Sequence, residues 1–94
     1  MYTVTVHHHD KYWRNGDLED KFELIDKRFF KTRTSAKEYI EQQLQGKGTI
    51  RMEWHKGDEP SYAYRWTGVT WQHENSGETM EEYYQYTLKK CKLN

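Results

Sequence analysis

The chain has 94 residues, of which 34% are hydrophobic and 32% are charged, and its 15 basic side chains balance its 15 acidic ones. A chain of this length can build one hydrophobic core, so we expect a single α+β domain over residues 1–94. The zero net charge argues against a broad electrostatic footprint for nucleic acid or for an acidic membrane surface.

The single cysteine, Cys91, excludes an intrachain disulfide framework and a zinc site built from paired cysteines of this chain. No apolar run has the length of a signal peptide or of a membrane span. The sequence has no repeat, no low-complexity tract and only one proline. We therefore expect an ordered, soluble, cytoplasmic protein.

The first local signal is Asn15-Gly16, a dipeptide that tolerates the positive φ angles of a two-residue hairpin turn. The flanking residues predict a β-hairpin with three pairs of opposite charges: Arg14 and Asp17, Lys11 and Asp20, Asp10 and Lys21. This register puts apolar side chains on both faces: Trp13, Leu18, Phe22 and Leu24 on one, Val4, Val6 and Ile25 on the other. One buried face cannot take both sets, so we expect a bulge near His8 to Asp10.

A helix is predicted next, within the segment TRTSAKEYIEQQLQGKG. Ser35 followed by Glu38 forms a capping box, and Gly46 supplies the stop signal. Three apolar residues recur at helical spacing and predict the buried face: Ala36, Ile40 and Leu44.

From Thr49 onward the hydrophobic pattern alternates every second residue, which predicts three strands in an antiparallel meander. We place its turns at Gly57 to Glu59 and at Thr67-Gly68. Large side chains then align in three ladders: Ile50/Trp66/Val69, Met52/Tyr64/Trp71 and Trp54/Tyr62/His73.

The segment after Gly77 fits two states. As a helix it would have Thr79 as N-cap, Glu82 at the third position and one apolar stripe: Met80, Tyr83, Tyr84, Thr87, Leu88 and Cys91. As a strand it would alternate Tyr84, Tyr86 and Leu88. We favour the helix, which gives the element order ββαβββα, with a final strand as the alternative.

His7 and His9 are the candidate metal ligands, because residues two apart on a strand project from one face. His73 or Asp20 could approach as a third ligand. A solvated or partly packed histidine run is the ordinary interpretation, so we predict neither a metal ion nor a cofactor. The histidines could still make stability depend on pH.

No arrangement of side chains indicates catalysis. Ser35 and Ser61 lie outside any nucleophile-elbow context, and no glycine-rich phosphate loop is present. Adjacent carboxylates such as Glu81 and Glu82 are usually two solvated charges. We therefore expect a protein that is not an enzyme.

Aromatic residues are abundant, with four Trp, eight Tyr and three Phe. Tyrosines at the margin of the core account for most of them, but exposed rings can anchor protein interfaces or stack on unpaired bases. We assign Tyr83 and Tyr86 as candidate partner anchors. The alternative is a single-stranded nucleic-acid module that uses residues of the hairpin: Lys11, Tyr12, Trp13 and Arg14.

The C-terminal segment EEYYQYTLKKCKLN, preceded by the acidic stretch HENSGETMEE, resembles the end of the small type II-A anti-CRISPR proteins, with which phages block an RNA-guided nuclease. The resemblance covers residues 73–94. It implies that acidic side chains stand in for DNA phosphates, a role that would fall here to Glu74, Glu78, Glu81 and Glu82. We accordingly expect a non-catalytic inhibitor of phage or mobile-element type that occupies a surface of a host or defence protein or nucleoprotein.

Overall fold

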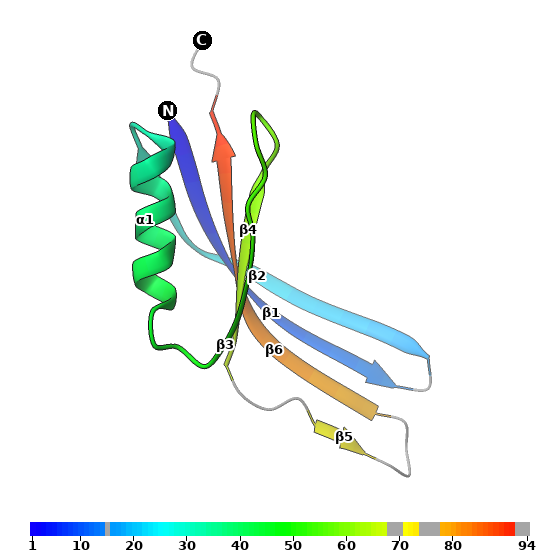
Figure 1. The fold of residues 1–94 in the computed structure, drawn as a ribbon. Coiled ribbons are helices and arrows are strands. Elements are labelled where there is room, and N and C mark those ends of the chain that lie inside the picture. The colour runs from blue at the N-terminus through cyan, green and yellow to red at the C-terminus, as the bar shows by residue number, and fades with distance from the viewer. Residues whose placement is uncertain (15, 68–70, 74–77, 92–94) are drawn as a thin grey trace.

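The computed structural model describes residues 1–14, 16–67, 71–73 and 78–91, with the backbone alone for 71–73, 78 and 79. These ranges form a small α+β domain (Figure 1) with these elements in chain order: β1 (Tyr2–Arg14), β2 (Asp17–Phe30), α1 (Arg33–Leu44), β3 (Thr49–Glu53), β4 (Ser61–Trp66), β5 (Trp71–His73) and β6 (Glu78–Lys90).

All strands join one antiparallel sheet in the order β2-β1-β6-β4-β3, and the short β5 pairs with the N-terminal end of β6. The last strand of the chain therefore lies in the middle of the sheet, between β1 and β4. The favoured C-terminal helix is wrong, and the strand alternative is what forms. The reason is tertiary: β1 and β4 offer β6 a ladder on each edge, and the Tyr and Thr side chains of β6 suit a pleated surface.

The N-terminal hairpin is confirmed, and all three pairs of opposite charges face each other as predicted. The bulge lies slightly earlier than expected, between Val6 and His7, where Ile25 is the extra residue on β2. Gly16 adopts a φ of 85°, which the hairpin turn requires. Asn15 lies outside the described residues.

The helix is confirmed, but its start is not at the predicted cap. Thr32 is the N-cap, and its side chain accepts a hydrogen bond from the backbone N–H of Ser35. Ser35 thus lies inside the first turn, because the Thr-Arg-Thr-Ser run offers several hydroxyls and the earliest one caps. The predicted buried face is correct: Ala36, Ile40 and Leu44 are the buried residues of α1.

The predicted meander is wrong in both register and neighbours. Ile50 faces Arg65 and Met52 faces Ala63, a shift of one residue from the expected ladders. Beyond β4 lies β6, not β5, and β5 pairs with β6 as well. The Gly68 turn and Val69 lie outside the described residues. Local turn signals were a poor guide here because the distant β6 supplies the pairing edge.

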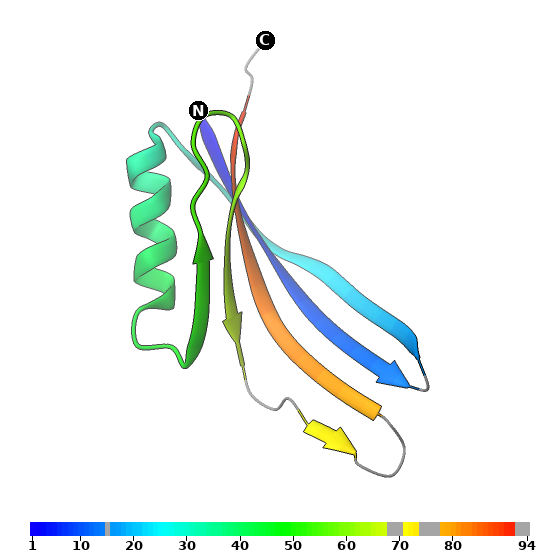
Figure 2. The same ribbon diagram turned by 45° about the vertical axis from the view of Figure 1, so that its right-hand side comes forward.

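Helix α1 packs on one face of the sheet, beside the start of β1 and the end of β2 (Figures 1 and 2). The buried cluster combines residues of α1 with residues of β1, β4 and β6: Val4, Val6, Ala36, Ile40, Leu44, Ala63, Tyr86 and Leu88. Residues 7–14, 17–24 and 78–84 continue beyond the helix as a bent ribbon, which we call the arm. The molecule is consequently elongated, with extents of 52 × 31 × 23 Å.

Among the described residues, no helix combines the length and the apolar character that crossing a bilayer would demand.

Candidate functional site

The sheet face opposite α1, which we call the open face, carries a row of rings from four strands. Tyr64 and Trp66 come from β4, and their ring centroids lie 5.9 and 5.7 Å from that of Tyr83 on β6. The His9 ring of β1 stacks on Tyr83 at 4.7 Å and on Phe22 of β2 at 5.4 Å. The register explains the row, because directly opposite residues share a face. Tyr83, in the middle, is only 5% exposed.

Charged side chains surround this row and line a shallow depression of about 450 Å³. The ammonium group of Lys11 lies 5.2 Å from the centre of the Tyr83 ring. A hydrogen bond to Tyr83 is the main cause that raises the pKa of Lys11 above its ordinary value. The indole N–H of Trp66 donates to the carboxylate of Glu81. The charged residues of the lining are two cations and three carboxylates: Lys11, Arg51, Asp20, Glu53 and Glu81.

Strand β2 adds a row of exposed apolar side chains at the edge of the sheet. Leu18, Phe22 and Leu24 are 53%, 64% and 55% exposed. They face Trp13, His9 and His7 across the hairpin, so they belong to the open face. Ile25 at the bulge and Phe29 beyond it are also exposed. The open face therefore combines a tightly packed aromatic row with an apolar edge that lacks a cover among the described residues.

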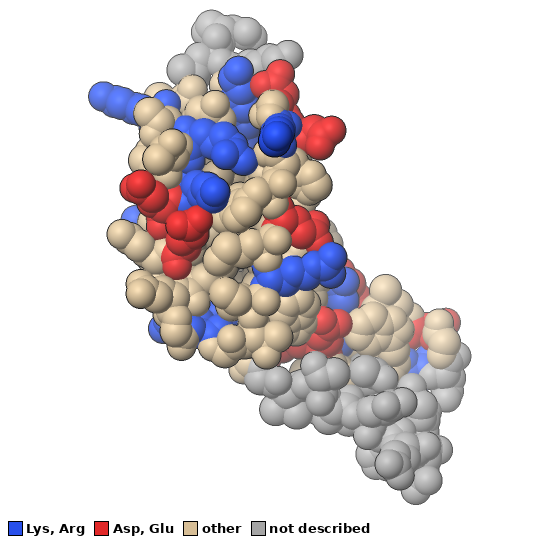
Figure 3. All heavy atoms as spheres, viewed as in Figure 1, with Lys and Arg blue, Asp and Glu red and all other residues tan. Residues whose placement is uncertain are grey.

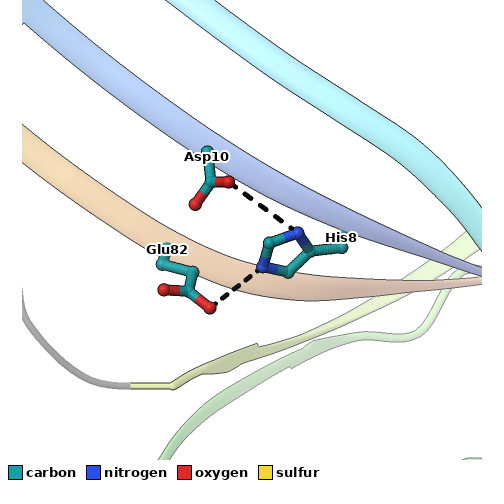
Figure 4. Close-up of side chains that lie close together, drawn as sticks. All are labelled: His8, Asp10 and Glu82. Atoms are coloured by element: carbon teal, nitrogen blue, oxygen red, sulfur yellow. Dashed lines mark hydrogen bonds and ion pairs between the residues drawn. The ribbon is translucent and has the colours of Figure 1, made fainter.

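A second group of side chains lies on the opposite face of the arm, where His8, Asp10 and Glu82 converge (Figure 4). Nε2 of His8 is 3.0 Å from Oε1 of Glu82, and Nδ1 of His8 is 3.9 Å from Oδ2 of Asp10. The hydrogen bond to His8 is the main cause that lowers the pKa of Glu82. The ring of His8 also rests 5.0 Å from that of Tyr84.

The acidic residues assigned to a partner do not form one patch among the described residues. Glu81 belongs to the open face and Glu82 to the opposite face, because neighbours on a strand alternate. The backbone of Glu78 pairs with His73 in β5, and its side chain lies outside the described residues, as does all of Glu74. Figure 3 shows acidic and basic side chains interspersed over the visible face.

The two candidate tyrosine anchors also separate. Tyr83 lies on the open face under its aromatic neighbours, whereas Tyr86 belongs to the core beneath α1 and is 6% exposed. Burial is the main cause that raises the pKa of Tyr86. A partner would reach the rings around Tyr83 more readily than either tyrosine itself.

The hairpin quartet assigned to nucleic acid is divided between the faces. Lys11 and Trp13 point to the open face, and Tyr12 and Arg14 to the other, because their pairing with β2 alternates. A base stacked on Trp13 could therefore not contact Tyr12 from the same side.

The two histidines considered as metal ligands, His7 and His9, do share a face, with ring centroids 6.4 Å apart. Asp20, one of the two residues considered as a third ligand, does approach His9, with 3.2 Å between His9 Nδ1 and Asp20 Oδ1. The group of three metal-capable side chains nevertheless forms around His8, the histidine between them. Its spacing of two residues from Asp10 was visible in the sequence, but Glu82 joins only through the β1–β6 register.

The chain matches no protein-family model, and neither the curated proteins nor the solved structures contain a significant match to it.

Proposed function

We propose that the protein is a non-catalytic binding protein that docks its open face on an apolar surface of a partner protein. The observation that supports this proposal is the row of Leu18, Phe22 and Leu24, each more than half exposed on an edge strand. Asp20 is the one charged residue between them on this face, and large apolar side chains gathered on an exposed strand are typical of protein interfaces. The neighbouring aromatic row offers the rigid rings that such interfaces use as anchors.

The partner class follows from the charges beside the rings. Three carboxylates and two cations line the depression, so a nucleic-acid backbone would meet net repulsion there. A protein surface with an apolar centre and mixed charges at its rim fits this arrangement better. The resemblance of the C-terminal segment implies stoichiometric inhibition of a host or defence nucleoprotein. We propose this form of the function, in which the open face contacts the protein component of that nucleoprotein.

The test changes the apolar row without touching the core. We would isolate a partner from host lysate with the intact chain as bait and purify it. The purified partner is then titrated with the wild type, with a variant of the apolar row and with a control variant. Leu18→Lys/Leu24→Lys should weaken the complex at least tenfold, which corresponds to about 1.4 kcal/mol. The control is Ile50→Lys, a single substitution of the same type at a residue that is 41% exposed on the face that carries α1. Equal affinity of the double variant and the wild type would refute the proposed surface.

The single-stranded nucleic-acid alternative is separated by the same variants. Added lysines would strengthen binding to a labelled oligonucleotide at low salt, where phosphate contacts are strongest. We expect no oligonucleotide binding by the wild type under these conditions. Tight, salt-sensitive binding that increases in Leu18→Lys/Leu24→Lys would favour the alternative instead.

A further inference from the structure

The side of the arm that faces away from the open face brings three ligand-bearing side chains together by register alone. His8 and Asp10 are two residues apart on β1, so they project from the same face. Glu82 lies directly opposite Asp10 on β6, so it projects from that face too. One imidazole and two carboxylates thus converge from β1 and β6, which are neighbours in the sheet although they lie at opposite ends of the sequence (Figure 4).

From this arrangement we infer a binding site for one divalent transition-metal ion of the Zn²⁺ type, held by His8, Asp10 and Glu82. One ligand atom from each residue can be chosen so that all three lie within 4.8 Å of one another. Zn²⁺ ligands stand about 2.1 Å from the ion, so two of them are at most about 4.2 Å apart. The 3.0 Å between His8 Nε2 and Glu82 Oε1 already lies inside that limit.

Asp10 lies beside the other ring nitrogen of His8, with 3.9 Å between Oδ2 and Nδ1, so its side chain must turn toward Nε2 to close the site. The side chains of Asp10 and Glu82 are 43% and 40% exposed, so both carboxylates are open to solvent on one side. The His8 ring is less exposed, at 20%, and Tyr84 supports one of its faces. The histidine is therefore the fixed ligand and the carboxylates are the adjustable ones, with positions left for water.

The donor set selects the class of ion. Imidazole nitrogen suits Zn²⁺ and its first-row neighbours, whereas Mg²⁺ and Ca²⁺ prefer sites made of oxygen alone. Two carboxylates balance the charge of a divalent ion. The ion would tie β1 to β6 close to the bend, since Val6, two residues before His8, is already part of the core.

The experiment titrates the full-length, metal-free chain with Zn²⁺ and separately with Mg²⁺, by calorimetry and by thermal melting. We expect one Zn²⁺ per chain, a higher Tm with Zn²⁺ and no response to Mg²⁺. His8→Gln and Asp10→Asn/Glu82→Gln should each lower the Zn²⁺ affinity at least tenfold. Circular dichroism of the metal-free variants verifies that each has folded.

Two other histidines provide matched controls. His9→Gln removes a histidine of the open face that also lies near a carboxylate, and His55→Gln removes one whose Nδ1 is 3.6 Å from Glu59. Both should bind Zn²⁺ like the wild type. Undiminished binding in His8→Gln, or an equal loss in either control, would place the ion elsewhere and overturn the inference, as would equal responses to Mg²⁺ and Zn²⁺.

Discussion

At the scale of single residues, the fold rests on a few apolar side chains in contrasting environments. Ile40 is fully buried between α1 and the sheet, whereas Ile50, the same residue type on β3, is 41% exposed. Truncation of Ile40 removes contacts and leaves a cavity that the surrounding layers cannot fill. Ile40→Ala should therefore cost about 2–5 kcal/mol of the free energy of unfolding, and Ile50→Ala less than about 1 kcal/mol. Chemical denaturation of both variants measures this, and equal losses would contradict the assigned core.

Asp26 is one residue that should make stability depend on acid pH. Its carboxylate accepts hydrogen bonds from Arg28 Nε at 3.0 Å and from the backbone N–H of Lys27 at 2.9 Å, and Tyr39 lies nearby at 3.5 Å. The hydrogen bond from Arg28 is the main cause that lowers the pKa of Asp26 below its ordinary value of 3.8.

Since the folded state prefers the ionised carboxylate, its contribution is present above pH 3.8 and is lost as the pH falls through the lowered pKa. Asp26→Asn should therefore melt at a lower temperature than the wild type at neutral pH. The two melting curves should approach each other in acid. A difference in Tm that stays constant over the whole pH range would show that the charge of Asp26 does not stabilise the folded state.

At the scale of the elements, the start of α1 offers a direct comparison of two hydroxyls. Thr32 caps the helix through its side chain, while Ser35 donates its own hydroxyl to the Thr32 carbonyl at 3.1 Å. Thr32→Ala leaves the Ser35 backbone N–H without its acceptor and should cost about 1 kcal/mol. Ser35→Ala keeps that cap, so its cost in the same denaturation experiment should be smaller. The opposite order would support the capping box expected from the sequence.

The elements that the sequence predicts well are those whose partners are near in the chain. The hairpin follows from Asn15-Gly16 and its charge pairs, and the helix from the spacing of Ala36 and Ile40, because each signal lies within one local segment. β6 is different, because the same residues suit a helical stripe and a strand. Its state is decided by β1, which pairs Tyr2 with Lys90 across almost the entire chain.

The candidate sites share this limit. The exposed apolar residues of β2 were visible as a pattern, but their exposure depends on α1 covering the other face. His8 and Glu82 are 74 positions apart, so their contact could not be inferred without the register of β6. Sequence spacing instead pointed to His7 and His9, which share a face but meet different neighbours.

At the scale of the whole molecule, the long strands connect two halves with separate tasks. The half under α1 contains the buried cluster and supplies the stability. The arm carries the edge residues Leu18 to Leu24 on one face and the His8 group on the other, with little core of its own. Substitutions of the exposed side chains of the arm should consequently change binding far more than folding, which is the pattern expected of a binding surface supported by a stable scaffold.

The most direct measurement of the central claim, that the open face contacts a partner protein, is site-specific photo-crosslinking. A benzophenone amino acid replaces Leu24 in one protein and Ile50 in another, both exposed positions. We expect position 24 to give a discrete protein adduct in host lysate. Excess unlabelled wild type should suppress it, and excess Leu18→Lys/Leu24→Lys, in which position 24 is also changed, should not. An adduct from position 50 alone, or equal suppression by both competitors, would contradict the account.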